Sequence, residues 1–123
     1  IHSKYAEDLA RFETEEEIIT KDVKILAKQF QKLLKRLEKD QQPENIITQI
    51  KMPDVNDYLN SYRKALELRN NLKLDLIIND IHSKAECIAS FLALLELFKL
   101  KEIYLDQTQG NKFNIIKREE NNG

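Results

Sequence analysis

Residues 90–100 read SFLALLELFKL, and eight of these eleven positions are apolar in a chain that is 33% charged. A helix that spans a bilayer needs about 20 consecutive apolar residues. This run is shorter, and Glu96 and Lys99 interrupt it. The stretch therefore argues against a membrane segment. It predicts a core helix whose apolar surface exceeds what a small domain covers, which leaves some of it for a protein partner.

A helix start signal precedes this stretch, and a hairpin signal follows it. Ser83 and Glu86 form the pattern of a capping box, so the helix should begin there and continue to the end of the opening stretch. Downstream, EIYLDQ (102–107) and KFNIIKR (112–118) have the composition of strands. Gly110 lies between them, which predicts a β-hairpin with a turn at this glycine.

Three further elements are expected on the N-terminal side. IITQIKM (46–52) is short and β-branched, which predicts a strand. The stretch 54–69 has apolar residues at helical spacing, with Asp54 as its expected N-cap. LDLIIND (74–80) fits either a strand or a short helical turn. With the hairpin, this order predicts a winged-helix domain at 46–123, a compact helical trio with a β-hairpin wing.

TKDVKILAKQFQKLLKRLEK (20–39) is the clearest amphipathic helix, with Thr20 as its expected N-cap. Its apolar side carries Val23, Leu26, Phe30, Leu33, Leu34 and Leu37. Its opposite side carries Lys21, Lys24, Lys28, Lys32, Lys35 and Lys39. Residues 1–19 are rich in glutamate and predict a solvated, poorly ordered lead-in, and DQQPEN (40–45) predicts a linker. The fold class is thus mainly α with a small β-hairpin: a lead-in and amphipathic helix at 1–45, then the winged-helix domain.

Both sides of this helix have two possible roles. From Lys21 to Lys39 there are seven basic and two acidic residues, although the whole chain has a net charge of −1. The lysine side is either a solvated face or a contact with DNA backbone or an acidic protein, because phosphate contact requires only positive charge. Any DNA contact is expected to be weak or indirect, through Lys24, Lys28, Lys32 and Lys35. The apolar side either packs on the rest of this chain or lies in a groove of another protein.

No catalytic or metal-binding constellation can be assembled from the sequence. His2 and His82 belong to no spaced set of metal ligands, and two glycines cannot build a phosphate loop. Cys87 lies in the apolar helix and is expected to be a small buried hydrophobe. We therefore expect no enzyme, no metal and no cofactor. A single cysteine forms no internal disulfide, which favours a reducing, cytoplasmic location.

Reading of DNA bases is not expected from the helix at 83–100. Such a helix presents polar and basic side chains to the major groove. This one offers Lys84 and Lys99 on different turns, among leucines and alanines. A nucleic-acid-binding regulator that uses the lysine-rich helix 21–39 is the alternative function from another class.

SKAECIASFLALLELFKLKEIYLDQTQGNKFNII (83–116) resembles the C-terminal winged helix of the bacterial kleisin family, segregation and condensation protein A (ScpA). The matching features are FLALLEL, then an acidic residue with glutamine at Asp106-Gln107, then Phe113 and Ile115. DVKILAKQFQKLLKRLE (22–38) is similar to the family's helix before that domain. Leu100-Lys101-Glu102 stands where the family commonly has a glycine, and no N-terminal GPLDLLL-like segment is present.

The resemblance implies a non-enzymatic, nucleoid-associated subunit of a bacterial Smc–ScpA–ScpB condensin, with this chain as its central-to-C-terminal part. In that family the winged helix docks on an ATPase head of Smc, and the preceding region carries a dimer of ScpB. By position, the Smc contact would involve Tyr58, Tyr62, Tyr104, Leu105, Gln107, Phe113 and Ile115. The ScpB contact would involve Val23, Leu26, Phe30, Leu33, Leu34 and Leu37.

Overall fold

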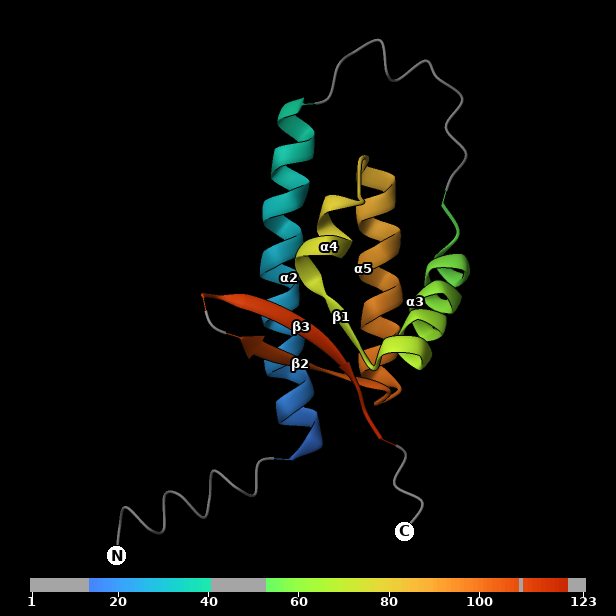
Figure 1. The fold of residues 1–123 in the computed structure, drawn as a ribbon. Coiled ribbons are helices and arrows are strands. Elements are labelled where there is room, and N and C mark those ends of the chain that lie inside the picture. Colours follow the sequence, from blue (N-terminus) through green and yellow to red (C-terminus); the bar gives the residue numbers. More distant parts are fainter. Residues whose placement is uncertain (1–13, 41–52, 109, 120–123) are drawn as a thin grey trace, which may run out of the picture.

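The computed structural model describes residues 14–40, 53–108 and 110–119, and it is mainly helical with a small antiparallel sheet (Figure 1). Its elements are α2 (Glu15–Asp40), α3 (Val55–Arg69), β1 (Asn71–Lys73), α4 (Leu74–Asn79), α5 (Lys84–Lys99), β2 (Ile103–Thr108) and β3 (Lys112–Lys117). The three strands lie in the order β1-β3-β2. The mainly α class with a hairpin is confirmed. The strand expected at 46–52 lies outside the described residues, as does the linker at 40–45 apart from Asp40.

The α5 helix lies at the centre, with α2 packed on one side and α3 on another (Figure 1). The core helix predicted from the opening stretch is confirmed, because its buried residues are Cys87, Ala89, Ser90, Ala93, Leu94, Leu97 and Phe98. Its predicted cap is confirmed too. The Ser83 hydroxyl accepts a hydrogen bond from the Glu86 N–H at 3.1 Å, and the Glu86 carboxylate accepts one from the His82 N–H at 2.8 Å. The first bond satisfies an amide group that the first helical turn leaves without a partner, and the second ties down the residue before the N-cap.

The α2 helix begins at Glu15, so the predicted N-cap at Thr20 was wrong. Instead, Thr14 precedes the helix, and its hydroxyl accepts from the Glu17 N–H at 3.1 Å. The same hydroxyl donates to the Glu17 carboxylate at 3.1 Å, while Thr20 donates to the Glu16 carbonyl at 2.7 Å. Three glutamates in the first turn also interact favourably with the positive end of the helix dipole. The end of the acidic lead-in is therefore helical.

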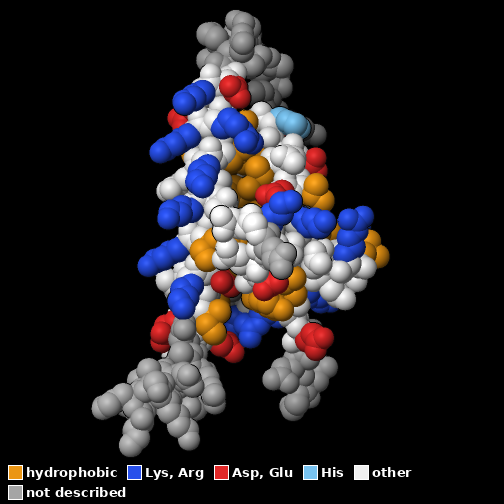
Figure 2. Space-filling view, turned by 60° about the vertical axis from the view of Figure 1, so that its left-hand side comes forward, with side chains coloured by type: hydrophobic (Ala, Val, Ile, Leu, Met, Phe, Trp, Pro, Cys, Tyr) orange, Lys and Arg blue, Asp and Glu red, His pale blue; other side chains and the backbone are white. Residues whose placement is uncertain are grey.

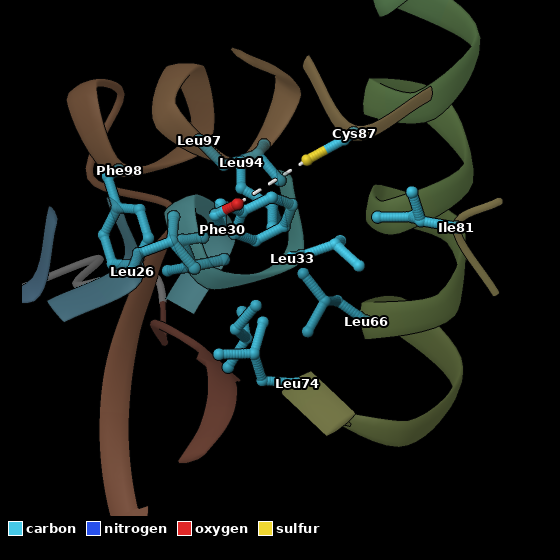
Figure 3. Close-up of a cluster of buried hydrophobic side chains, with 12 residues drawn as sticks. Leu26, Phe30, Leu33, Leu66, Leu74, Ile81, Cys87, Leu94, Leu97 and Phe98 are labelled. Carbon is cyan, nitrogen blue, oxygen red and sulfur yellow. Dashed lines mark hydrogen bonds between the residues drawn. The ribbon is translucent and has the colours of Figure 1, made fainter. Parts of the chain in front are cut away.

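One side of α2 completes the hydrophobic core of the domain. Its lysines face outward in a column along the helix (Figure 2), while Leu26, Phe30 and Leu33 are buried. These three side chains share a cluster with Leu94, Leu97 and Phe98 of α5 (Figure 3). The α2 helix and the C-terminal elements thus share one core. The division of the chain at residue 45 stays a prediction, because residues 41–52 lie outside the described part.

Further contacts join α2 to α5. The Phe30 and Phe91 rings lie 5.5 Å apart between centroids, and the Cys87 thiol donates to the Phe30 carbonyl at 3.8 Å (Figure 3). Cys87 is buried, as the sequence predicted, and that burial raises the pKa of its thiol. A thiol that holds its proton and faces a carbonyl is a packing group rather than a nucleophile.

The elements between α3 and α5 resolve an ambiguity in the sequence. Asp54 caps α3 as predicted and accepts from the Asn56 N–H at 2.9 Å. Asn70 ends α3 in the left-handed conformation, with a φ of 63°. The chain then forms β1, which the sequence pattern does not predict, and the stretch 74–80 is helical at Leu74–Asn79. The described sheet therefore contains β1 in addition to the two strands of the predicted hairpin.

The predicted hairpin of β2 and β3 is confirmed, with Leu105 opposite Ile115. Gly110 has a φ of 76° and Asn111 a φ of 60°, so the glycine occupies a backbone conformation that suits it in the turn. The outer edge of β2 faces α2. There the Leu105 N–H donates to the Asp22 carboxylate at 3.0 Å, and burial raises the pKa of this aspartate.

A group of ion pairs joins the start of α2 and the middle of α3 to the segment between α5 and β2 and to the residue after β3. Arg63 donates two hydrogen bonds to Glu102, at 2.9 and 2.7 Å. Lys101 lies 2.8 Å from Glu15, which lowers the pKa of that carboxyl, and Arg118 lies 3.7 Å from the same residue. Lys101 has a φ of 63°, a conformation that favours glycine, directly after the end of α5.

The shared core predicts a large difference between two leucine-to-alanine substitutions. Leu26→Ala removes a side chain that is fully buried between α2 and α5, and we expect it to lower the free energy of unfolding by about 2–5 kcal/mol. Leu68→Ala, at a side chain that is 84% exposed, should change it by less than about 0.5 kcal/mol. Urea unfolding followed by circular dichroism measures both. Equal, small effects would show that α2 does not contribute to the core in solution.

Candidate partner-binding surfaces

The described residues contain no group of three or more His, Cys, Asp or Glu side chains that could hold a metal ion. In the same part of the chain, no helix is long and apolar enough to span a membrane. His82 is exposed beside the start of α5, and its backbone N–H donates to the Glu86 carboxylate.

Four of the hairpin residues predicted to bind Smc share one face of the sheet. Leu105 lies opposite Ile115, and Gln107 lies opposite Phe113. Ile115 is fully buried, while Leu105 and Phe113 pack partly buried against the core. Gln107 is exposed and donates to the Asn111 side chain at 3.1 Å. This face thus serves mainly the core, and Gln107 is the member of the four that a partner can reach.

Tyr104 lies on the other face of the hairpin. Tyr104 is 42% exposed, and Ile116 lies directly opposite it on β3. The two side chains line a shallow hollow together with Asn70, Lys117 and Glu119. Ile116 was not among the residues predicted from the sequence, although the two-residue alternation of strands could have placed it on the face of Tyr104. A half-exposed tyrosine beside an isoleucine is typical of the centre of a protein contact.

The two remaining residues predicted to bind Smc lie together on α3. The Tyr58 and Tyr62 rings are 6.0 Å apart between centroids, and the Tyr62 hydroxyl shares a hydrogen bond with Ser90 of α5. Burial raises the pKa of Tyr62 to about 12. Tyr62 therefore joins α3 to α5. The residues predicted from the sequence fall at two places, the hairpin and the contact between α3 and α5.

A groove between α3 and α5 is a second apolar surface. It is lined by Val55, Asn56, Leu59, Leu92, Leu95, Glu96 and Lys99. Leu92 is 43% exposed, and the neighbouring Ile88 is also exposed. The residues SFLALLELFKL predicted more apolar surface on α5 than the core would cover. The groove itself could not be predicted from them, because its other wall is formed by α3. Exposed aliphatic side chains in a groove are typical of a docking site.

The six α2 residues predicted to bind ScpB all lie on the side that faces the core. Leu26, Phe30 and Leu33 are buried, and Val23, Leu34 and Leu37 pack partly buried against them. The sequence left open whether this apolar side covers its own chain or another protein. In the structure it covers its own chain, so a partner could reach it only after α2 moves away from α5.

The opposite side of α2 is basic. Lys24, Lys28, Lys32 and Lys35, which we call the lysine row, are all exposed and lie along one line of the helix (Figure 2). Lys39 continues the row toward the end of the helix. The net positive charge expected from the sequence is therefore concentrated on one outward surface.

The raised pKa of Tyr62 predicts how stability changes at high pH. The folded state keeps this proton up to about pH 12, whereas the ordinary pKa is 10.0. The contribution of Tyr62 to the free energy of unfolding is therefore complete below pH 10.0 and is lost as the pH rises toward 12. The free energy of unfolding should fall by about 3 kcal/mol over this interval because of Tyr62. Urea unfolding across this interval should show a smaller loss for Tyr62→Phe than for the original chain. Tyr104→Phe, on the outer face of the sheet, should keep the full loss; equal losses in all three proteins would contradict the assignment.

Comparison with known proteins identifies the family. No curated protein and no solved structure shows significant similarity to the chain. The family model of segregation and condensation protein ScpA matches residues 2–114 of the 123. This range includes α2, α3, α5 and β2 and ends within β3, and it agrees with the resemblance found from FLALLEL and its flanking residues. The match supports a condensin-associated role in chromosome segregation and condensation, and the chain belongs to the segregation and condensation protein ScpA family.

Proposed function

We propose that this chain is the central-to-C-terminal part of a bacterial ScpA-type kleisin, which links an Smc ATPase head to ScpB at the nucleoid without chemistry of its own. The family match over residues 2–114 is the observation that carries this proposal. The surfaces of the chain are compatible with it. They offer apolar areas at Tyr104 and between α3 and α5, and a basic area along α2.

The order of elements supports a winged-helix arrangement within this proposal. From α3 onward the chain runs helix, strand, helix, helix, strand, strand, and the sheet order is β1-β3-β2. In such an arrangement α5 would occupy the place of a DNA-reading helix. Its exposed side carries Ile88 and Leu92, with Lys84 and Lys99 at its two ends. Base edges require hydrogen-bonding side chains, so this surface suits a protein partner better than DNA bases.

For the Smc head, we favour docking through the Tyr104 face of the hairpin. Tyr104 and Ile116 provide an aromatic and an aliphatic anchor, and Lys117 and Glu119 provide charged groups around them. Interfaces concentrate their affinity in such central anchors surrounded by polar residues. Gln107 lies on the opposite face of the same strand, so it is outside this contact. Leu105, Phe113 and Ile115 would support the hairpin from its core side, and Tyr58 and Tyr62 would fix α3 on α5.

Two substitutions with matched exposure test this docking surface. Tyr104→Asp places a charge on the hairpin face, and Leu92→Asp places one in the groove between α3 and α5, where the side chains are 42% and 43% exposed. We expect Tyr104→Asp to weaken binding to an Smc head fragment by about tenfold or more, and Leu92→Asp to leave it within about threefold. Isothermal titration calorimetry measures both affinities, and circular dichroism confirms that each variant is folded. The reverse result would move the contact to the groove, and no binding by the original chain would reject Smc as the partner.

The ScpB contact, as proposed for the apolar side of α2, requires that side to be uncovered. Because Leu26, Phe30 and Leu33 are buried against α5, the intact chain should bind ScpB through them only when α2 detaches. In a peptide of residues 15–40, α5 is absent and does not compete with ScpB for the apolar side of α2. We expect this peptide to bind ScpB at least about tenfold more tightly than the intact chain does. Equal affinities, or binding by the intact chain alone, would exclude the apolar side of α2 as the contact.

A further inference from the structure

We infer that the lysine row of α2 binds the phosphate backbone of duplex DNA. Successive residues of an α-helix are separated by about 100° and a rise of about 1.5 Å, so Lys24, Lys28, Lys32 and Lys35 fall within an arc of about 80° and span about 17 Å. Their outward direction is fixed, because Leu26, Phe30 and Leu33 on the other side are buried (Figure 2). The row is therefore a straight line of positive charge held on a rigid element.

Nearby carboxylates do not neutralise this line. Two acidic residues occur between Lys21 and Lys39. Asp22 accepts a hydrogen bond from the Leu105 N–H on the sheet side of α2, and Glu38 lies 3.8 Å from the Lys84 ammonium of α5. In the described part of the chain, none of the four lysines of the row has an ion pair within 4.0 Å. The acidic first turn of α2 pairs elsewhere, since Glu15 and Glu16 face Lys101.

Charge and shape together favour duplex DNA as the ligand. An amphipathic helix that binds a membrane inserts its apolar side into the lipid, but the apolar side of α2 is used by the core. A straight row of charge on a rigid helix complements a straight polyanion, and duplex DNA carries one negative charge per about 1.7 Å of its axis. Lysine is a flexible point charge, which suits phosphate contact without base recognition. A role in chromosome segregation and condensation also brings the chain close to DNA.

This contact would be independent of the sequence of the DNA and would add to the proposed function rather than depend on it. The row lies on the side of α2 away from the core, whereas the Smc contact is proposed on the hairpin and the ScpB contact on the apolar side. Loss of DNA binding with intact Smc binding would therefore be distinguishable from failure of the Smc proposal.

The test is fluorescence anisotropy with a labelled random-sequence duplex of about 30 base pairs and the 123-residue chain, between about 50 and 200 mM salt. Four phosphate contacts predict that log Kobs falls with log salt with a slope of about −3 to −4. Replacement of the four lysines of the row by glutamine should bring the slope close to zero and weaken binding at the lowest salt by about tenfold or more. Replacement of the same four lysines by arginine should preserve the binding, because the charge remains.

A matched control removes the same charge elsewhere. It replaces four other exposed lysines by glutamine: Lys64, Lys73, Lys99 and Lys112. This variant should bind DNA within about threefold of the original chain, and thermal unfolding checks that all variants are folded. The proposal is overturned if the original chain binds no DNA at the lowest salt or if both glutamine variants lose equal affinity. It is also overturned if poly-glutamate displaces the duplex as effectively as unlabelled DNA, since the row would then be a site for acidic proteins.

Discussion

The packing of α2 against α5 is the contact on which the rest of the structure depends. The α5 helix is apolar over most of its circumference, and α3 and the sheet cover only part of it. Leu26, Phe30 and Leu33 of α2 cover another part and are buried with Leu94 and Phe98. This one contact decides the roles of both sides of α2. The apolar side becomes core, and the lysine row is left facing solvent on the opposite side of the helix.

Much of the fold could be predicted from local signals in the sequence. The capping residues Asp54 and Ser83 act within a few residues of themselves, and the hairpin depends on a turn at Gly110. Such signals require no knowledge of distant parts of the chain. The start of α2 also has a local signal, but the sequence interpretation placed it at the wrong threonine. Thr14 and Glu17 form a cap six residues before the expected one, and the glutamates there suggested solvated chain although they favour a helix start.

The candidate sites were harder to predict, because they depend on contacts between distant residues. Ile115 and Tyr104 are both large residues in the hairpin, yet one is fully buried and the other is 42% exposed. Their difference follows from which face of the sheet meets the helices. Likewise, the periodicity of α2 identifies an apolar side but not the surface that covers it. The strand β1 has only three residues and forms through its pairing with β3, so propensity alone could not predict it.

The hydrogen bond between Asp22 and Leu105 has a consequence for self-association. In the described sheet, β2 is an outer strand, and such strands can recruit a strand from another molecule. Here the Asp22 carboxylate of α2 accepts a hydrogen bond from one of the outward N–H groups of β2, and the helix lies against that edge. By covering this edge, α2 also hinders pairing of β2 with a strand of another molecule. A chain that releases α2 to reach a partner would expose this edge at the same moment.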